Sequence, residues 1–186
     1  MKDIAMEKFY LESIRKAGAR VEDLARSMYV QFVLADYNLY NETEKAAGPD
    51  VARKVHKNAR LRYVPWVIKD AFEDLRIGEV KDKDVSTVGR IARRVYERTS
   101  CPFKVKEDTG DCFVGVVLDC PIVDFSMGLF DEELGCPYHQ SSAEVCVASM
   151  NELVKQLGQS ENIEVIQDKF ICRDDDYCQI IIQRKR

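Results

Sequence analysis

The first half of the chain has apolar residues spaced three and four apart, which is the spacing of amphipathic helices. This pattern predicts a helix over residues 3–18 and a longer one from Val21 to about Ala47, where Gly48 and Pro49 stop it. Three more helical patterns follow, at 50–62, at 67–75 and in the segment after an N-cap at Asp84. Residues 1–99 are therefore expected to form a helical half.

The pattern changes near residue 100, where apolar and polar residues begin to alternate as they do in strands. One hairpin is predicted from strands at 103–106 and 112–118, and a second from strands at 163–172 and 177–183. Each pair of strands is separated by a short stretch of turn-forming residues, so the strands of each pair should be antiparallel neighbours.

A helix is predicted between the two hairpins. Ser141 and Glu144 stand as they do in a helix capping box, which predicts a helix over 141–157. Residues 100–186 therefore have the order β-β-α-β-β. Together with the helical half, this order predicts one α+β domain over residues 1–186, with helices packed on a small antiparallel sheet of two hairpins.

Composition and charge narrow the function classes. The chain has 186 residues, of which 46% are hydrophobic, and its net charge is −4. The hydrophobic content suffices for a core, and the negative charge argues against a nucleic-acid partner. No apolar run is long enough for a membrane span, and the charged start predicts no signal peptide, so a cytoplasmic location is expected. The seven cysteines should then be mostly reduced.

Two thiols and an imidazole stand within eleven residues, at Cys136, His139 and Cys146, and Cys178 follows on the last predicted strand. Thiolate and neutral imidazole are ligands that zinc prefers. These four residues therefore predict a site for zinc or another divalent transition metal. Two alternatives stay open. Cys136 or Cys146 could be a nucleophile with His139 as its base, or the cysteines could simply be buried as small apolar residues.

Other polar residues have simpler interpretations. Residues 36–42, which include Tyr37 and Tyr40, predict either a polar working face on the long helix or a solvated face with partly buried tyrosines. His56 is a lone histidine on a charged helix and is expected at the surface. Cys172 and Cys178 flank an acidic turn and could be neighbours across the second hairpin.

Several short motifs of the second half carry a family resemblance. They are Asp119-Cys120-Pro121, Cys136-Pro137-Tyr138-His139, Cys146 and Asp175-Asp176-Tyr177-Cys178. With these motifs the chain resembles the L-2-amino-thiazoline-4-carboxylic acid hydrolase family. It is also similar to the 4-vinyl reductase domain, whose relatives include haem nitric-oxide-binding domains and Golgi-transport tethering subunits. The resemblance implies an α/β domain that holds a ligand between its helices and its sheet.

The resemblance and the candidate residues together suggest several functions. The first is a hydrolase that opens the thiazoline ring of a cyclic amidine at a C–N bond, with water activated by a metal at Cys136, His139 and Cys146 and with Glu144 or Asp176 moving protons. A small-molecule ligand would then lie near residues Tyr37, Tyr40 and Cys120. The second is a non-catalytic sensor domain that binds a metal or a hydrophobic small ligand. A third candidate comes from the residues and not from the resemblance. The long helix from Val21, with Tyr37 and Tyr40, suggests a structural module with a homodimer formed through the helical half.

Overall fold

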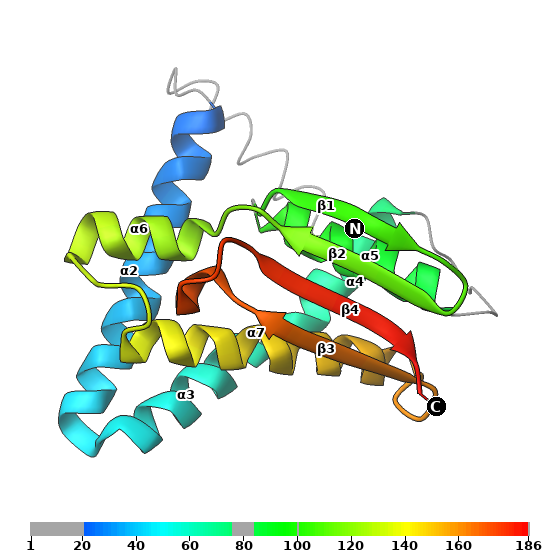
Figure 1. The fold of residues 1–186 in the computed structure, drawn as a ribbon. Coiled ribbons are helices and arrows are strands. Elements are labelled where there is room, and N and C mark those ends of the chain that lie inside the picture. The colour runs from blue at the N-terminus through cyan, green and yellow to red at the C-terminus, as the bar shows by residue number, and fades with distance from the viewer. Residues whose placement is uncertain (1–20, 76–83, 100, 186) are drawn as a thin grey trace, which may run out of the picture.

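The computed structural model describes residues 21–75, 84–99 and 101–185, and the helix predicted at 3–18 lies outside these ranges. In the described residues, helices pack against a four-stranded antiparallel sheet, which confirms the predicted α+β class (Figure 1). Within the same ranges, no helix combines the length and the apolar character needed to cross a bilayer.

The helical half follows the predicted pattern closely. Its described helices are α2 (Val21–Ala47), α3 (Pro49–Leu61), α4 (Val64–Asp74) and α5 (Val85–Arg98). Gly48 separates α2 from α3 with a φ of 86°, a left-handed conformation that favours glycine. Asp84 caps α5, because its side chain accepts a 2.7 Å hydrogen bond from the backbone N–H of Thr87.

The second half contains the two predicted hairpins. Its elements are β1 (Phe103–Asp108), β2 (Cys112–Val117), α6 (Pro121–Phe130), α7 (Pro137–Gln156), β3 (Ile163–Lys169), the short 3-10 turn η1 (Ile171–Arg173) and β4 (Cys178–Arg184). The strand order is β1-β2-β4-β3, and every neighbouring pair is antiparallel. The β2–β4 pair therefore joins the two hairpins into one sheet.

The helix between the hairpins begins earlier than the capping-box pattern predicts. α7 starts at Pro137, with Cys136 as its N-cap. Proline suits this first position because its missing N–H would have no partner inside the helix. Ser141 consequently lies within α7 and not at its start. Its side chain is buried, and its hydroxyl contacts His56 on α3. The capping-box prediction is wrong in its details, although the helix itself is real.

The main hydrophobic core lies between one face of the sheet and the helices α4, α5 and α7. The approach of α5 to β2 is especially close at Gly89, where a Cβ atom would collide with the ring of Phe113. Helices α2, α3 and α6 lie towards one end of the sheet (Figure 1). There they contact the first turns of α7, which places a second group of packed side chains outside the main core.

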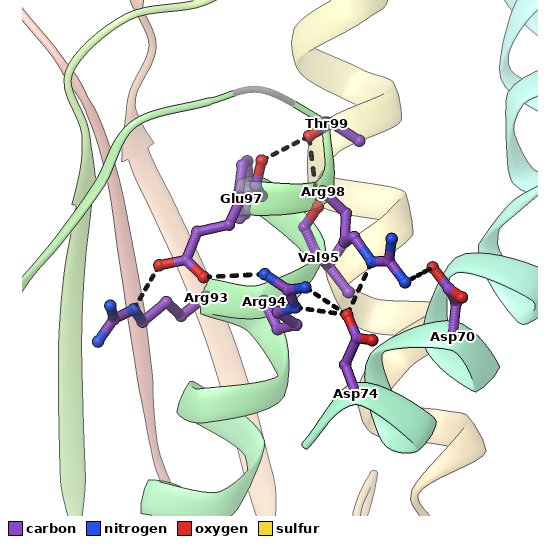
Figure 2. Close-up of polar contacts among 9 residues, drawn as sticks. Asp70, Asp74, Arg93, Arg94, Val95, Glu97, Arg98 and Thr99 are labelled. Atoms are coloured by element: carbon purple, nitrogen blue, oxygen red, sulfur yellow. Dashed lines mark hydrogen bonds and ion pairs between the residues drawn. The ribbon is translucent and has the colours of Figure 1, made fainter. Parts of the chain in front are cut away.

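Ion pairs join α4 to α5 on the outside of this core (Figure 2). Asp74 accepts from both Arg94 and Arg98, and Arg98 also bonds Asp70 at 2.6 Å. All four side chains are partly exposed. The network therefore adds a modest surface contact between the two helices, and it is not a buried charge site.

Candidate functional site

The polar centre of the molecule lies where α2, α3 and α7 meet. α2 contributes Asp36, α3 contributes His56 and Arg60, and α7 contributes Tyr138 and Ser141. The members from α3 are four residues apart and those from α7 are three apart, so each pair lies on one face of its helix. We call these five residues the Asp36 network.

Asp36 is the common acceptor of this network. Its Oδ2 atom accepts from His56 Nε2 at 3.0 Å, from Arg60 Nη1 at 2.9 Å and from the Tyr138 hydroxyl at 2.8 Å. Burial alone would raise the pKa of Asp36, but the hydrogen bond from His56 and the charge of Arg60 outweigh it and hold the pKa at about 2. The carboxylate is therefore ionised at neutral pH.

His56 links Asp36 to Ser141. Its Nδ1 atom lies 2.6 Å from the Ser141 hydroxyl, and its Nε2 faces Asp36. Because a carboxylate can only accept, Nε2 carries a proton, and in the neutral ring Nδ1 accepts from Ser141. The side chain of His56 is fully buried, so the expectation that it lies at the surface is wrong. Its neighbours in sequence are charged, but its own face of α3 is turned inward.

An Asp-His-Ser chain of this kind can activate a serine for nucleophilic attack when a substrate reaches it. Here Ser141 is 1% exposed and His56 is 0% exposed. The hydroxyl is enclosed by packed side chains, so a substrate carbonyl has no approach to it. The observed role of these bonds is structural, because they join α2, α3 and α7 through the charged carboxylate of Asp36.

The second part of the site is a group of thiols around a small apolar cluster. The cluster consists of Val123, Ala143, Phe170 and Cys172, with Cys120, Cys146 and Cys178 packed against it. We call this group the thiol cluster. Burial raises the pKa of Cys146 to about 11 and that of Cys178 to about 12, so both thiols are protonated at neutral pH. A protonated buried thiol behaves as a small apolar group.

Cys120 differs from the other cysteines. It is the N-cap of α6, and its carbonyl accepts a 2.8 Å hydrogen bond from the backbone N–H of Val123. The neighbouring Cys101 side chain, the backbone amides at the start of α6 and the charge of Arg60 lower the pKa of Cys120. All seven cysteines lie in the described residues, and the other six have a raised pKa. Cys120 is therefore the most acidic thiol of the protein.

Arg60 belongs to the Asp36 network, and its charge also acts on thiols of the thiol cluster. Its side chain is 15% exposed, and its Cζ atom lies 5.4 Å from the centre of the Phe32 ring. Nη1 bonds Asp36, while Nε and Nη2 make no hydrogen bond to any described residue. Its charge also lowers the pKa of Cys120. Arg60 thus offers unused N–H donors beside an apolar, thiol-lined region, an arrangement suited to an anionic group.

The structure does not bring the four predicted metal ligands together. Cys136 packs near Tyr40 and Tyr138, whereas Cys146 and Cys178 border the thiol cluster. His139 Nε2 is engaged by the Ser126 hydroxyl at 2.6 Å. In the described ranges, no three His, Cys, Asp or Glu side chains are arranged to hold a metal ion. The described residues therefore form no ready-made zinc site, and zinc binding stays a prediction from the sequence.

The other predicted site residues occupy different surroundings. Glu144 and Asp176 are exposed, so neither faces the Asp36 network or the thiol cluster. The ring of Tyr37 stacks on Phe130 with centroids 3.8 Å apart. Tyr40 is 1% exposed and its hydroxyl has no partner among the described residues. The prediction of a ligand near these two tyrosines stays untested.

Sequence reasoning missed most of the Asp36 network. Asp36 stood in the segment identified as polar, but His56, Arg60 and Ser141 were not connected to it. One signal was available, because Ala52, His56 and Arg60 are each four residues apart and so share one helix face. Nothing in the sequence indicates that α2 and α7 supply the partners of that face.

Comparison with known proteins gives a likeness in fold and none in sequence. No protein-family model and no curated protein matches the chain. One similar solved structure is a trafficking protein particle complex subunit 3 from Naegleria fowleri, covalently bound to palmitic acid. The TM-score is 0.56 and the sequence identity is 14%, and the match covers 87% of this chain and 97% of that one. An Fe(II) unliganded H-NOX protein from K. algicida has a TM-score of 0.38 and 17% identity, over 89% and 91%, which is too weak to support an inference.

These comparisons bear on the family resemblance. The likeness to the trafficking subunit supports the α+β fold alone, because the identity is low. The resemblance to the thiazoline hydrolase family has no support from any family model or curated sequence.

Proposed function

We propose that this chain is a non-catalytic binding domain for a carboxylic acid with a long apolar body, such as a fatty acid. The observation that carries the proposal is Arg60, a largely buried guanidinium whose Nε and Nη2 bond no described residue and whose charge acts on Cys120 of the thiol cluster. The proposal develops the interpretation as a hydrophobic small-ligand domain and includes no metal.

The head group of the ligand would pair with Arg60. A guanidinium has five N–H donors, and a single one is bonded to Asp36. The free edge could take both oxygens of a carboxylate in a bidentate pair. Since this pair would be shielded from water, it would be stronger than the same pair at a surface.

The apolar body would lie against the thiol cluster. Cys146 and Cys178 remain uncharged at neutral pH, and Val123 and Phe170 supply hydrocarbon and aromatic surface. Each methylene of an alkyl chain removed from water contributes about 0.8 kcal/mol. A long saturated chain would therefore supply most of the affinity, and Arg60 would fix its orientation.

The similarity in fold to the trafficking subunit also supports an acyl-chain ligand. The trafficking subunit from Naegleria fowleri was solved with palmitic acid attached covalently. A fold of this class can therefore hold a long acyl chain in at least one protein. The head-group role of Arg60 in the present chain is argued from its own contacts.

Hydrolysis of a thiazoline ring has no such support. The two carboxylates proposed to move protons, Glu144 and Asp176, are exposed, and no three His, Cys, Asp or Glu side chains of the described residues are arranged to hold a metal. Ring opening and zinc binding stay predictions from the sequence.

The proposal can be tested by calorimetry of the delipidated protein with dodecanoate and, separately, with dodecanol. The wild type should bind dodecanoate more tightly than the alcohol. Arg60→Met should weaken dodecanoate binding by roughly ten- to a hundredfold, the effect of losing a charged hydrogen bond, and should leave dodecanol binding unchanged. Arg53→Met is a matched control, because Arg53 lies on the same helix and is more exposed.

Two results would overturn the proposal. One is a wild type that binds neither compound, and the other is an Arg60→Met protein that binds dodecanoate as the wild type does. Because Arg60→Met leaves Asp36 with one donor fewer, Arg60→Lys provides a second variant. It keeps the charge but loses the planar fork, so it should fold and still weaken dodecanoate binding.

A further inference from the structure

The consecutive helices α3 and α4 carry a concentration of positive charge in an otherwise acidic chain. Residues 51–69 contain six arginine and lysine side chains and no aspartate or glutamate, whereas the whole chain has a net charge of −4. Both helices contact α7, so each has one side that is covered and one that can face a partner. Charge of one sign along two helices favours an anionic partner.

Most of this charge lies on the outward side of α3. The inward side carries His56, which is fully buried. Three cations in or directly after this helix are exposed: Lys54, Lys57 and Arg62. Among the described residues, none of these three has an ion-pair partner, unlike the other cations of the segment. Their charges are therefore available to a molecule outside the protein.

Two aromatic side chains are exposed where α3 meets α4. Tyr63 is 62% exposed, and Trp66, the only tryptophan of the chain, is 66% exposed. No other large hydrophobic side chain of the described residues is as exposed. Aromatic rings with a polar N–H or O–H group suit the boundary between water and the hydrocarbon of a bilayer. We call the following residues the α3–α4 patch: Lys54, Lys57, Arg62, Tyr63, Trp66 and Lys69.

The acidic residues of the two helices do not cancel the charge of the α3–α4 patch. Asp50 at the start of α3 is paired on its own helix. Asp70 and Asp74 are paired with arginines of α5 (Figure 2). Glu73 lies 3.9 Å from Lys69, and both side chains are highly exposed, so this contact is weak. The patch therefore keeps a net positive charge beside its aromatic rings.

We propose that the α3–α4 patch docks the protein on the surface of a membrane that contains anionic phospholipids. Trp66 and Tyr63 enter the interfacial region of the bilayer, and the cations lie against the lipid phosphates. The contact is peripheral, because no described helix is long and apolar enough to cross a bilayer. The inference does not depend on the fatty-acid ligand proposed above.

The composition of the α3–α4 patch favours a lipid surface over a macromolecule. Three of its four cations are lysines, a residue that is depleted at protein–protein interfaces but attracted to anionic bilayers. The long stems of these side chains can lie along the apolar region while their charges stay in water. Nucleic acid is disfavoured by the acidic character of the chain as a whole.

The test is sedimentation of the full chain with phosphatidylcholine vesicles and with vesicles that also contain about 30% phosphatidylserine, whose anionic head groups attract basic residues. The protein should pellet with the anionic vesicles and stay in solution with the neutral ones. Salt at about 1 M should release it, because it screens the attraction. Because Trp66 is the only tryptophan, its emission should shift to shorter wavelength when the anionic vesicles are added.

Substitutions assign the binding to the patch. Lys57→Gln and Arg62→Gln should each weaken partitioning to anionic vesicles about fivefold, and Lys57→Arg should bind as the wild type does. Trp66→Ala should weaken it about tenfold, because an apolar side chain no longer enters the interface. Lys104→Gln is the matched control, since Lys104 is exposed on β1 and lies outside the patch.

Three results would overturn the inference. The first is a wild type that pellets with neither kind of vesicle, or equally with both. The second is unchanged partitioning of Lys57→Gln and Arg62→Gln when Lys104→Gln is also unchanged. The third is binding of a single-stranded RNA oligonucleotide, lost in the same two variants, by a protein that ignores the vesicles. Circular dichroism spectra of the variants check that each substitution leaves the fold intact.

Discussion

Tyr138 on α7 donates a 2.8 Å hydrogen bond to Asp36 on α2, although 102 positions separate the two residues. The same carboxylate oxygen accepts from two side chains of α3. One buried charge thus carries the polar connection among three helices. Packing alone would allow these helices to shift along one another, whereas three donors aimed at one oxygen define a single arrangement.

Acid should destabilise the protein through Asp36. Its folded pKa of about 2 lies below the ordinary value of 3.8. A depressed carboxyl pKa contributes stability above the unfolded pKa, and this contribution is lost as the pH falls towards the folded pKa. About 2 kcal/mol should therefore disappear between roughly pH 5 and pH 2. Urea unfolding at several pH values, compared with Asp36→Asn, measures this change, and parallel pH profiles of the two proteins would contradict it.

Tyr138→Phe should remove one donor of the Asp36 network and leave the ring in place. The expected cost is about 1 kcal/mol in the free energy of unfolding, because Asp36 keeps its bonds to His56 and Arg60. Tyr63→Phe is the matched control, since Tyr63 is 62% exposed. Equal denaturation midpoints for the two variants would show that the Tyr138 hydroxyl does not contribute.

Ser141→Ala should lower stability by about 1 kcal/mol, the usual effect of losing a buried hydrogen bond. A fluorophosphonate probe for activated serines should not label Ser141 in the wild type, because the hydroxyl is enclosed. Labelling that is lost in Ser141→Ala would instead show that the Asp-His-Ser chain is open to substrates.

Gly89→Ala should destabilise the contact between α5 and β2. The added Cβ would collide with the Phe113 ring, and overpacking of this kind costs about 1–3 kcal/mol. Phe113→Leu in the same chain should recover part of the loss by making room. Gly110→Ala serves as the control, because a Cβ at Gly110 meets no atom within 4 Å. Additive effects of the Gly89 and Phe113 substitutions would contradict the proposed collision.

The secondary structure could be predicted because each element carries its own local signal. Gly48 and Pro49 mark the boundary between the first two described helices, and Asp84 marks the start of another. The alternation of apolar residues identified both hairpins. α6 was harder to predict, because its short apolar segment at 121–130 also suits an irregular connection.

The site could not be predicted to the same degree because it depends on contacts between distant segments. Cys136 and Cys146 are close in sequence, but α7 separates them along its axis and directs them to different apolar clusters. His56 has charged neighbours in the sequence, and such neighbours predict an exposed side chain although the ring is buried. The acidity of Cys120 arises from its place at the start of α6 and from Cys101 across the hairpin.

The strand order places β4 between β2 and β3, so the last described strand occupies the interior of the sheet. During synthesis on a ribosome, the β1–β2 hairpin and β3 have no direct pairing with each other. Their edges remain open until residues 178–184 emerge from the exit tunnel. Completion of this sheet is therefore a late, long-range event, and in the interval a nascent chain presents the kind of unpaired strand edge that chaperones protect.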